Sequence, residues 1–273
     1  MEHLDVIVVG AGISGISAAV HLDQACPDKS VGILERRENI GGTWDLLKYP
    51  GIRSDSDMHT LGFSFKPWKA KKAIADGPSI MSYLGETVGE YQLADKIRFS
   101  HRVVAADWSS SQARWTLSID ENGSTKQMSC NFLFMCSGYY SYDEAYDAQI
   151  TGIGDFGGDV VHPQFWPEDL DYSGKRVVVI GSGATAVTLV PSMAAAGAKV
   201  TMLQRSPTYV VARPDEDAVA NVLRKALPES WAYKLTRFKN VAMQNYFYKQ
   251  SRKAPEKVRK QLLGFVKQLL PES

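Results

Sequence analysis

The chain has 273 residues, of which 44% are hydrophobic and 22% charged, and a formal net charge of +1. This length suits about two domains of roughly 150 residues each, and the balanced charge gives no indication of a nucleic-acid partner. The three cysteines form no CxxC pair, which argues against a disulfide scaffold and a zinc site and fits a reducing compartment. We therefore expect a cytoplasmic protein without a metal site.

The first residues predict a βαβ unit rather than a signal peptide. Residues 5–9 place four apolar, β-branched residues directly after Asp5, which is typical of a buried parallel strand. A helix is expected over residues 13–26 and a second strand over residues 31–35. No apolar run of the chain approaches the roughly 20 residues of a membrane-spanning helix.

Between the first strand and the helix lies the pattern Gly10-x-Gly12-x-x-Gly15, whose chemistry suits a diphosphate. Gly10 allows the tight turn, Gly12 removes a Cβ that would collide with the pyrophosphate, and Gly15 lets the helix pack close to the strand. The helix N-terminus offers free N–H groups, to which the Ser14 hydroxyl can add one more donor. The pattern therefore predicts a dinucleotide site.

Glu35 supports this prediction, because it lies 20 residues beyond Gly15 at the end of the second strand. An acid at this place accepts hydrogen bonds from ribose hydroxyls. The alternative is a surface acid at a strand end.

The middle of the chain predicts mixed structure, ending in a β-hairpin at the Asn122-Gly123 turn signal. We expect a loop over residues 41–44, a helix over 79–91, strands over 103–108, 114–119 and 131–136, and a glycine-rich linker over 152–158.

A second βαβ unit is predicted over residues 175–204, with the pattern Gly181-x-Gly183-x-x-Ala186 at its turn. The position corresponding to Glu35 carries Arg205, followed by Ser206. Arginine at this strand end accommodates the 2′-phosphate of NADP, so the sequence favours NADP(H) over NAD(H). The alternative for Arg205 is an exposed cation.

After Pro214 the pattern is helical to the end of the chain. Five apolar residues fall at helical spacing and predict a core-facing stripe: Leu262, Phe265, Val266, Leu269 and Leu270.

The same region is basic, because residues 221–273 hold 12 Lys or Arg against 3 Asp or Glu. This excess leaves open a solvated basic face, or a peripheral contact with the acidic inner face of a membrane or with a missing part of the protein. We divide the chain at residues 1–150, 151–212 and 213–273.

Between the two glycine patterns stands Phe156-x-Gly158-x-x-x-His162-x-x-x-Trp166-Pro167. This segment is similar at every fixed position to the fingerprint of Baeyer–Villiger monooxygenases, FxGxxxHxxxW followed by Pro or Asp. Three further stretches, over residues 41–46, 49–58 and 181–187, resemble the ethionamide-activating (EthA-type) members of that family. The resemblance covers essentially the whole chain.

The resemblance implies an α/β fold with two Rossmann-like dinucleotide-binding domains, one for FAD and one for NADP, the second incomplete and followed by a helical region. Beside the glycines, the residues expected at FAD are Ser14, Glu35, Thr43, Trp44, Asp45, Leu46, Asp55 and Val103. Those expected at NADP are Arg53, Ser54, Asp55, Ser182, Gly183, Ala184, Thr185, Ala186, Val187, Thr188, Arg205 and Ser206. In this family the fingerprint histidine, here His162, is expected to couple domain positions rather than to donate a proton.

The implied activity is an FAD- and NADPH-dependent monooxygenase, acting with O2 on a ketone or a sulfur compound through a C4a-peroxyflavin. Asp55 is the expected catalytic residue, because a carboxylate there would position the active-site Arg of the family. Members of the family are longer, with that Arg downstream of the point matching Ser273, so we interpret the chain as truncated at its C-terminus.

Two alternatives stay open: a non-catalytic nucleotide-binding remnant, and a flavin N- or S-monooxygenase outside the Baeyer–Villiger group. A flavin disulfide reductase is disfavoured, because it needs a redox dithiol.

Overall fold

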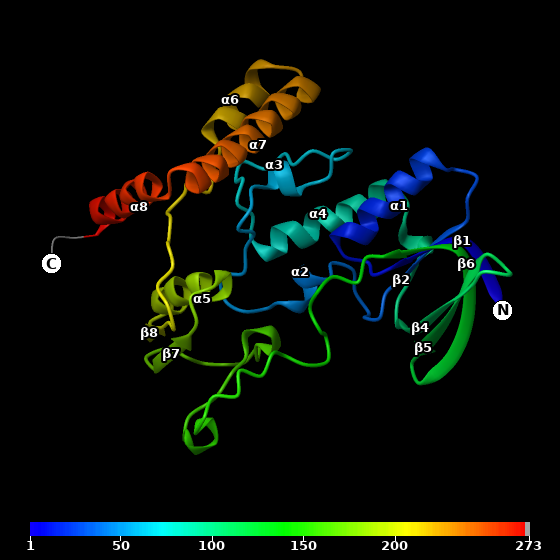
Figure 1. Ribbon diagram of the computed structural model, residues 1–273, viewed down its shortest axis with the longest axis horizontal. Helices are drawn as coiled ribbons and strands as arrows, with labels where there is room; N and C mark the ends of the chain where they lie inside the picture. The colour runs from blue at the N-terminus through cyan, green and yellow to red at the C-terminus, as the bar shows by residue number, and fades with distance from the viewer. Residues whose placement is uncertain (271–273) are drawn as a thin grey trace. The chain divides into compact units, whose positions relative to one another are not determined.

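The computed structural model describes residues 1–270 (Figure 1). These residues divide into two compact units. Unit 1 comprises Met1–Tyr49 and Gly77–Leu170, and the described part of unit 2 comprises Pro50–Asp76 and residues 171–270. Each unit contains one of the two glycine patterns. The three-part division at residues 150 and 212 stays a prediction.

Unit 1 is built on a six-stranded sheet in the order β3-β2-β1-β6-β5-β4. Its strands are β1 (Glu2–Val9), β2 (Val31–Leu34), β3 (Ile97–Arg98), β4 (His101–Ser109), β5 (Arg114–Glu121) and β6 (Ser124–Met135). The strands β3, β2, β1 and β6 run parallel, whereas β6, β5 and β4 form an antiparallel meander. The core lies on this sheet, formed by Ile7, Leu34, Leu117, Ile119, Met128 and Cys130. Burying each large aliphatic side chain contributes about 1.5–3 kcal/mol.

The strand expected over residues 131–136 is longer in the structure, because β6 serves two partners. Its first half pairs with β5 after the Asn122-Gly123 turn, and its second half pairs with β1. Both turn residues have positive φ, 52° and 85°, which confirms the predicted hairpin turn. The polar start of β6 carries no alternating apolar pattern, so the sequence reveals only its apolar second half.

The helices of unit 1 are α1 (Ile13–Ala25), α2 (Thr43–Leu46) and α4 (Gly77–Glu90), with the 3₁₀ turns η1 (Ala94–Lys96), η2 (Ile153–Asp155) and η3 (Pro163–Phe165). α1 and α4 lie side by side (Figure 1). α1 buries Ile16, Ala19 and Val20 and ends before Pro27, which disfavours helical backbone in the residue preceding it.

The loop expected over residues 41–44 is wrong at its end, because the short helix α2 begins at Thr43. Gly41 and Gly42 have φ of 107° and 55°, which turns the chain sharply. The N–H of Leu46 then donates to Gly42 O and closes one helical turn. A single turn is too short to show a 3.6-residue period in the sequence.

Unit 2 repeats the βαβ pattern with β7 (Arg176–Ile180), α5 (Ala184–Ala195) and β8 (Lys199–Leu203). Within the described residues its sheet has two parallel strands, as expected. One sheet face carries Val178, Ile180 and Leu203, each more than half exposed. The helices of this unit are α3 (Met58–Leu61), α5, α6 (Ala218–Ala226), α7 (Glu229–Lys253) and α8 (Pro255–Leu269).

The core-facing stripe expected on the last helix is wrong for three of its five residues, whereas Leu262 and Val266 are half-buried. Phe265, Leu269 and Leu270 are at least 60% exposed, and Val258 is the residue that α8 buries. Helical spacing identifies an apolar face but does not supply a surface to cover it. In the part of the chain with described structure, no helix combines the length and apolar character needed to span a bilayer.

Candidate functional site

The first glycine loop, between β1 and α1, is held tightly by the rest of unit 1. Gly10 has φ of 105° and donates its N–H to Leu34 O at 2.8 Å. A Cβ added to Gly10 would lie 2.5 Å from the carbonyl oxygen of Cys136, and one added to Gly15 would lie 1.8 Å from Gly10 O. Both glycines are therefore required by the packing of the protein itself.

Gly12 differs, because a Cβ there would lie 3.7 Å from its nearest neighbour, the Cα of Gly42. Van der Waals contact at that distance is ordinary, so the fold does not explain the glycine. Gly12 is also the N-cap of α1 without a side-chain hydrogen bond, and Ser14 is exposed in the first turn. The open N–H groups and the missing side chain suit a diphosphate at this helix end.

Glu35 lies at the end of β2 and is 4% exposed, so it is not the surface acid of the alternative interpretation. Its Oε2 accepts the N–H of Ala11 at 2.8 Å, and its Oε1 accepts the N–H of Arg37 at 2.9 Å. The carboxylate thereby ties the glycine loop to the strand end. Each oxygen keeps a second lone pair that can accept a ribose hydroxyl.

A hollow of about 440 Å³ lies next to this strand end in unit 1, and sequence reasoning did not predict its basic wall. It is lined by Arg36, Arg37, Asp45, Leu46, Lys48, Tyr142, Gln164, Phe165 and Trp166. Arg37 pairs with the buried Asp45 at 2.8 Å, and Thr43 and Trp44 precede that acid half-buried in α2. The hollow thus contains two of the expected FAD residues, Asp45 and Leu46.

Tyr142 completes the basic wall by lying against both arginines. The guanidinium carbons of Arg36 and Arg37 lie 5.5 and 5.4 Å from the centre of its ring, within the range of cation–π attraction. Burial raises the pKa of the Tyr142 hydroxyl. The two arginines that follow Glu35 can be identified in the sequence, but no pattern around Tyr142 predicts that its ring contacts them.

The fingerprint segment contributes Gln164, Phe165 and Trp166 to the hollow. His162 is exposed, and its Nδ1 accepts the N–H of Gln164 at 3.2 Å, which caps the turn η3. The Gln164 side chain is buried and donates to Ser141 O at 2.5 Å. The histidine thus shapes the segment that presents Trp166, and its expected role in coupling domain positions stays a prediction.

Val103, expected at FAD, lies in β4 and is half-buried against the core of unit 1. The start of its strand is held beside β2, because His101 donates its N–H to Glu35 O at 2.9 Å. The structure therefore brings the segment that carries Val103 to the same strand end as Glu35.

The second glycine loop, between β7 and α5 in unit 2, repeats the path of the first. Gly181 has φ of 131° and donates its N–H to Leu203 O at 2.8 Å, and Gly183 is an N-cap without a side-chain hydrogen bond. A Cβ added at either glycine would meet no atom within 4 Å. Around this turn lie the expected NADP residues Ser182, Ala184, Thr185, Ala186, Val187 and Thr188, of which Ala186 and Thr188 are buried. Arg205 and Ser206 follow β8 and are exposed.

The structure also brings the loop of residues 51–55 to α5, within the same unit. A Cβ on Gly51 would lie 2.0 Å from Ser192 Oγ, so the loop backbone touches the helix. Ser54 is 2% exposed and donates its N–H to Ala75 O at 2.8 Å, whereas Arg53 and Asp55 on either side are exposed. Asp55 belongs to unit 2, whereas the other residues expected at FAD belong to unit 1.

Two relatives of this chain among known proteins are described as FAD-containing or FAD-binding monooxygenases. The chain is 56% identical over 272 residues to the FAD-containing monooxygenase EthA of Mycobacterium tuberculosis, covering 99% of this chain and 56% of the relative. It is 52% identical over 271 residues to a probable FAD-binding monooxygenase AlmA of Acinetobacter baylyi, covering 98% of this chain and 54% of the relative. The chain thus spans about half the length of these relatives.

Solved structures agree with this likeness. An oxidized steroid monooxygenase bound to NADP is 32% identical with a TM-score of 0.70, covering 82% of this chain and 42% of that one. The monooxygenase OTEMO in complex with FAD and NADP is 28% identical with a TM-score of 0.67, covering 89% of this chain and 45% of that one. The α/β fold with two nucleotide-binding units is therefore confirmed.

A family model described as pyridine nucleotide-disulphide oxidoreductase matches residues 7–253, which include both glycine loops. The family is named for a dithiol chemistry that this chain does not carry, because its three cysteines are free and Cys130 is buried. What the chain shares with the family is the pair of dinucleotide folds. The chain belongs to the pyridine nucleotide-disulphide oxidoreductase family.

Proposed function

We propose that this protein is an FAD- and NADPH-dependent monooxygenase that acts with O2 on a ketone, in a Baeyer–Villiger oxidation, or on a sulfur compound. One observation carries the proposal: each unit has its own strand, glycine loop and helix, with the aromatic fingerprint between the two loops. Two dinucleotide sites on one chain suit the passage of a hydride from a nicotinamide to a flavin.

The first loop fits FAD. The diphosphate would lie at Gly12 and the first turn of α1. No packing contact of the protein requires a glycine there, and no side chain caps the helix end. Glu35 would accept a ribose hydroxyl, and the α2 segment with Asp45 would line the site. In this arrangement Gly10 and Gly15 set the loop, and Gly12 admits the cofactor.

The second loop fits NADP(H). Its diphosphate would lie at Gly183 and the first turn of α5, and the exposed Arg205 would bind the 2′-phosphate. The loop with Arg53 and Asp55 touches α5 and would contact the same cofactor. Asp55 in this loop has an exposed carboxylate, which would position the active-site arginine expected from the family resemblance.

The bound flavin, once reduced, supplies the oxygen-transfer chemistry with O2. The chain's own residues would bind and orient the cofactors: backbone N–H groups would hold the diphosphates, and Glu35 would accept a hydrogen bond from a ribose hydroxyl. The names of the relatives support this function, since EthA and AlmA are described as FAD-containing and FAD-binding monooxygenases. A cyclohexanone monooxygenase with bound cyclohexanone, 26% identical with a TM-score of 0.70, supports a ketone.

Purification of the 273-residue chain tests the proposal. We expect a yellow protein that oxidises NADPH faster when a linear methyl ketone or a thioether is present, with an ester or sulfoxide as product. Ester formation identifies Baeyer–Villiger activity, and sulfoxide without ester identifies an S-monooxygenase. A protein that binds both cofactors but forms neither ester nor sulfoxide, and at most consumes NADPH with release of peroxide, would be a remnant without monooxygenase activity, and the proposal would fail.

We also propose a peripheral contact with the acidic inner face of a membrane, made by α7. Trp231, Leu235, Phe238 and Tyr246 are all exposed and share one side of this helix, with Lys249 among them. Aromatic side chains beside lysines are typical of a helix that lies in a bilayer surface.

Vesicle co-sedimentation tests this contact. The chain is expected to sediment with phosphatidylglycerol vesicles but not with phosphatidylcholine vesicles, and Phe238→Ser should weaken the binding. The matched control is Tyr139→Ser, an exposed aromatic in unit 1. Equal binding of both variants, or no binding by the wild type, would exclude this contact.

A further inference from the structure

We propose that one face of α7 positions the loop of residues 53–55 for the nicotinamide cofactor, and that Asp57 is the positioning residue through which it acts. The inference rests on the proposed function, because it concerns the NADP(H) site of unit 2. Asp57 itself is two residues beyond Asp55 and is not among the residues expected to touch a cofactor.

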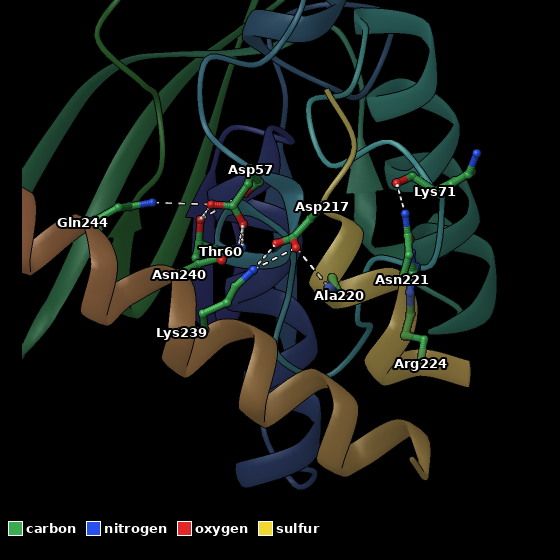
Figure 2. Close-up of polar contacts among 10 residues, drawn as sticks. All are labelled: Asp57, Thr60, Lys71, Asp217, Ala220, Asn221, Arg224, Lys239, Asn240 and Gln244. Carbon is green, nitrogen blue, oxygen red and sulfur yellow. Dashed lines mark hydrogen bonds and ion pairs between the residues drawn. The ribbon is translucent and has the colours of Figure 1, made fainter. Parts of the chain in front are cut away.

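Asp57 joins α3 to α7, two helices far apart in the sequence (Figure 2). Its carboxylate caps α3, accepting the N–H of Thr60 at 3.0 Å and the Thr60 hydroxyl at 2.8 Å. The same carboxylate accepts the side-chain amides of Asn240 at 2.9 Å and Gln244 at 3.4 Å, both on α7. Four donors on two helices thus converge on one side chain.

The other end of α3 is held by the same face of α7. Arg237 donates Nη1 to the carbonyl oxygens of His59 at 3.1 Å and Thr60 at 3.0 Å, which are left without partners at a helix C-terminus. Arg237, Asn240 and Gln244 are three and four residues apart, so they share one side of α7. A helix of one turn is therefore fixed at both ends by one rigid helix.

The two helices α6 and α7 are held together by polar contacts. Asp217 caps α6 through the N–H of Ala220 at 2.9 Å and pairs with Lys239 of α7 at 2.6 Å (Figure 2). Arg224 of α6 donates to Ala70 O at 3.1 Å, and the N–H of Ala73 donates to Asp215 O at 2.7 Å. Residues 57–60 and 69–74 thus form hydrogen bonds with residues that follow β8.

Asp57 is coupled to the cofactor loop by a tight turn. Ser54 is buried, its Oγ donates to Ser56 O at 2.5 Å and accepts the N–H of Ser56 at 3.1 Å. This turn sets the direction in which the exposed Arg53 and Asp55 leave the backbone. A displacement at Asp57 would therefore move both side chains without removing either of them.

Titration of NADP⁺ into the full chain by calorimetry tests the inference. Asp57→Asn keeps the side-chain size and the cap of Thr60 but loses a charged acceptor, so we expect about tenfold weaker NADP⁺ binding. FAD content, which depends on unit 1, should stay unchanged. The matched control is Glu256→Gln, an exposed acid of α8 in the same unit, which should bind NADP⁺ as the wild type does.

Two further variants separate positioning from folding. Asn240→Ala removes one α7 donor but leaves the cap intact, and should weaken NADP⁺ binding by several fold even if Asp57→Asn fails to fold. In Gln244→Ala, which removes the longer amide contact of 3.4 Å, the loss of NADP⁺ affinity should be smaller than in Asn240→Ala. Wild-type affinity in Asn240→Ala and in a folded Asp57→Asn would overturn the inference. A wild type that binds no NADP⁺ would overturn the proposed function, and this inference with it.

Discussion

The two glycine loops follow the same pattern, yet the protein surrounds them differently. In unit 1 an added Cβ at Gly10 or Gly15 would collide with backbone oxygens at 2.5 and 1.8 Å. In unit 2 no atom lies within 4 Å of a Cβ at Gly181 or Gly183, and the third position is already Ala186. The first loop is therefore constrained by packing, and the second by its backbone conformation and, under the proposed function, by the nucleotide it binds.

This difference separates two reasons for the same motif. A glycine that packs against backbone supports the fold, and its replacement should lower stability. A glycine with space around it supports ligand approach, and its replacement should lower affinity alone. Gly12 in unit 1 and Gly183 in unit 2 belong to the second kind, whereas Gly15 belongs to the first.

The largest expected effect is that of Gly15→Ala. Because the new Cβ would lie 1.8 Å from Gly10 O, helix and strand must separate, which should cost about 3 kcal/mol of unfolding free energy. Gly183→Ala is the matched control, with an expected cost below about 1 kcal/mol. Urea unfolding of both variants measures the contrast, and equal losses would contradict it.

Glu35→Ala should come next. It leaves the N–H groups of Ala11 and Arg37 without their acceptor, which should cost about 2 kcal/mol of unfolding free energy and weaken FAD binding. Glu38→Ala, an exposed acid three residues later, should cost less than about 0.5 kcal/mol. Thermal unfolding and flavin content check both, and a stable Glu35→Ala that retains FAD would refute the assignment.

The corresponding position of unit 2 should behave differently. Arg205 is exposed, so Arg205→Ala should leave stability unchanged but reduce the preference for NADPH over NADH by about tenfold, the loss of one charge-assisted hydrogen bond. Binding of the two nucleotides to the variant and the wild type measures this preference. An unaltered preference would return Arg205 to the alternative of an exposed cation.

The smallest expected effect is a pH dependence of unit 2. Burial lowers the pKa of the His59 ring, with Asp57 opposing it. As the pH falls below about 6.5, the unfolded chain binds a proton that the folded chain excludes, so stability decreases toward acid by at most about 1.4 kcal/mol per pH unit. His59→Phe should flatten this slope in urea unfolding between neutral and mildly acid pH, and identical slopes would contradict the expectation.

Sequence patterns within short stretches of the chain correctly predicted those structural elements that are determined by residues close together in the sequence. The two βαβ units, the Asn122-Gly123 turn and the acid at the end of β2 all follow from spacing within about 30 residues. Three residues of the stripe predicted near the C-terminus are exposed, because a period of 3.6 residues identifies an apolar face but not the surface that would cover it.

The contacts that complete both candidate sites were beyond prediction, because they join distant segments. Tyr142 reaches the arginines after Glu35 from a stretch without a periodic pattern. Asn240 binds Asp57 across 183 positions of sequence. An amide and a carboxylate so far apart leave no signal in spacing, and tertiary packing alone brings them together.

Calorimetric titration of FAD and of NADP⁺ into the variants Gly12→Ala and Gly183→Ala tests the central claim, which is that each unit binds its own dinucleotide. We expect Gly12→Ala to lose FAD and keep NADP⁺, and Gly183→Ala to lose NADP⁺ and keep FAD, with both variants folded. Loss of both ligands in one variant, or of neither in both, would contradict two independent sites.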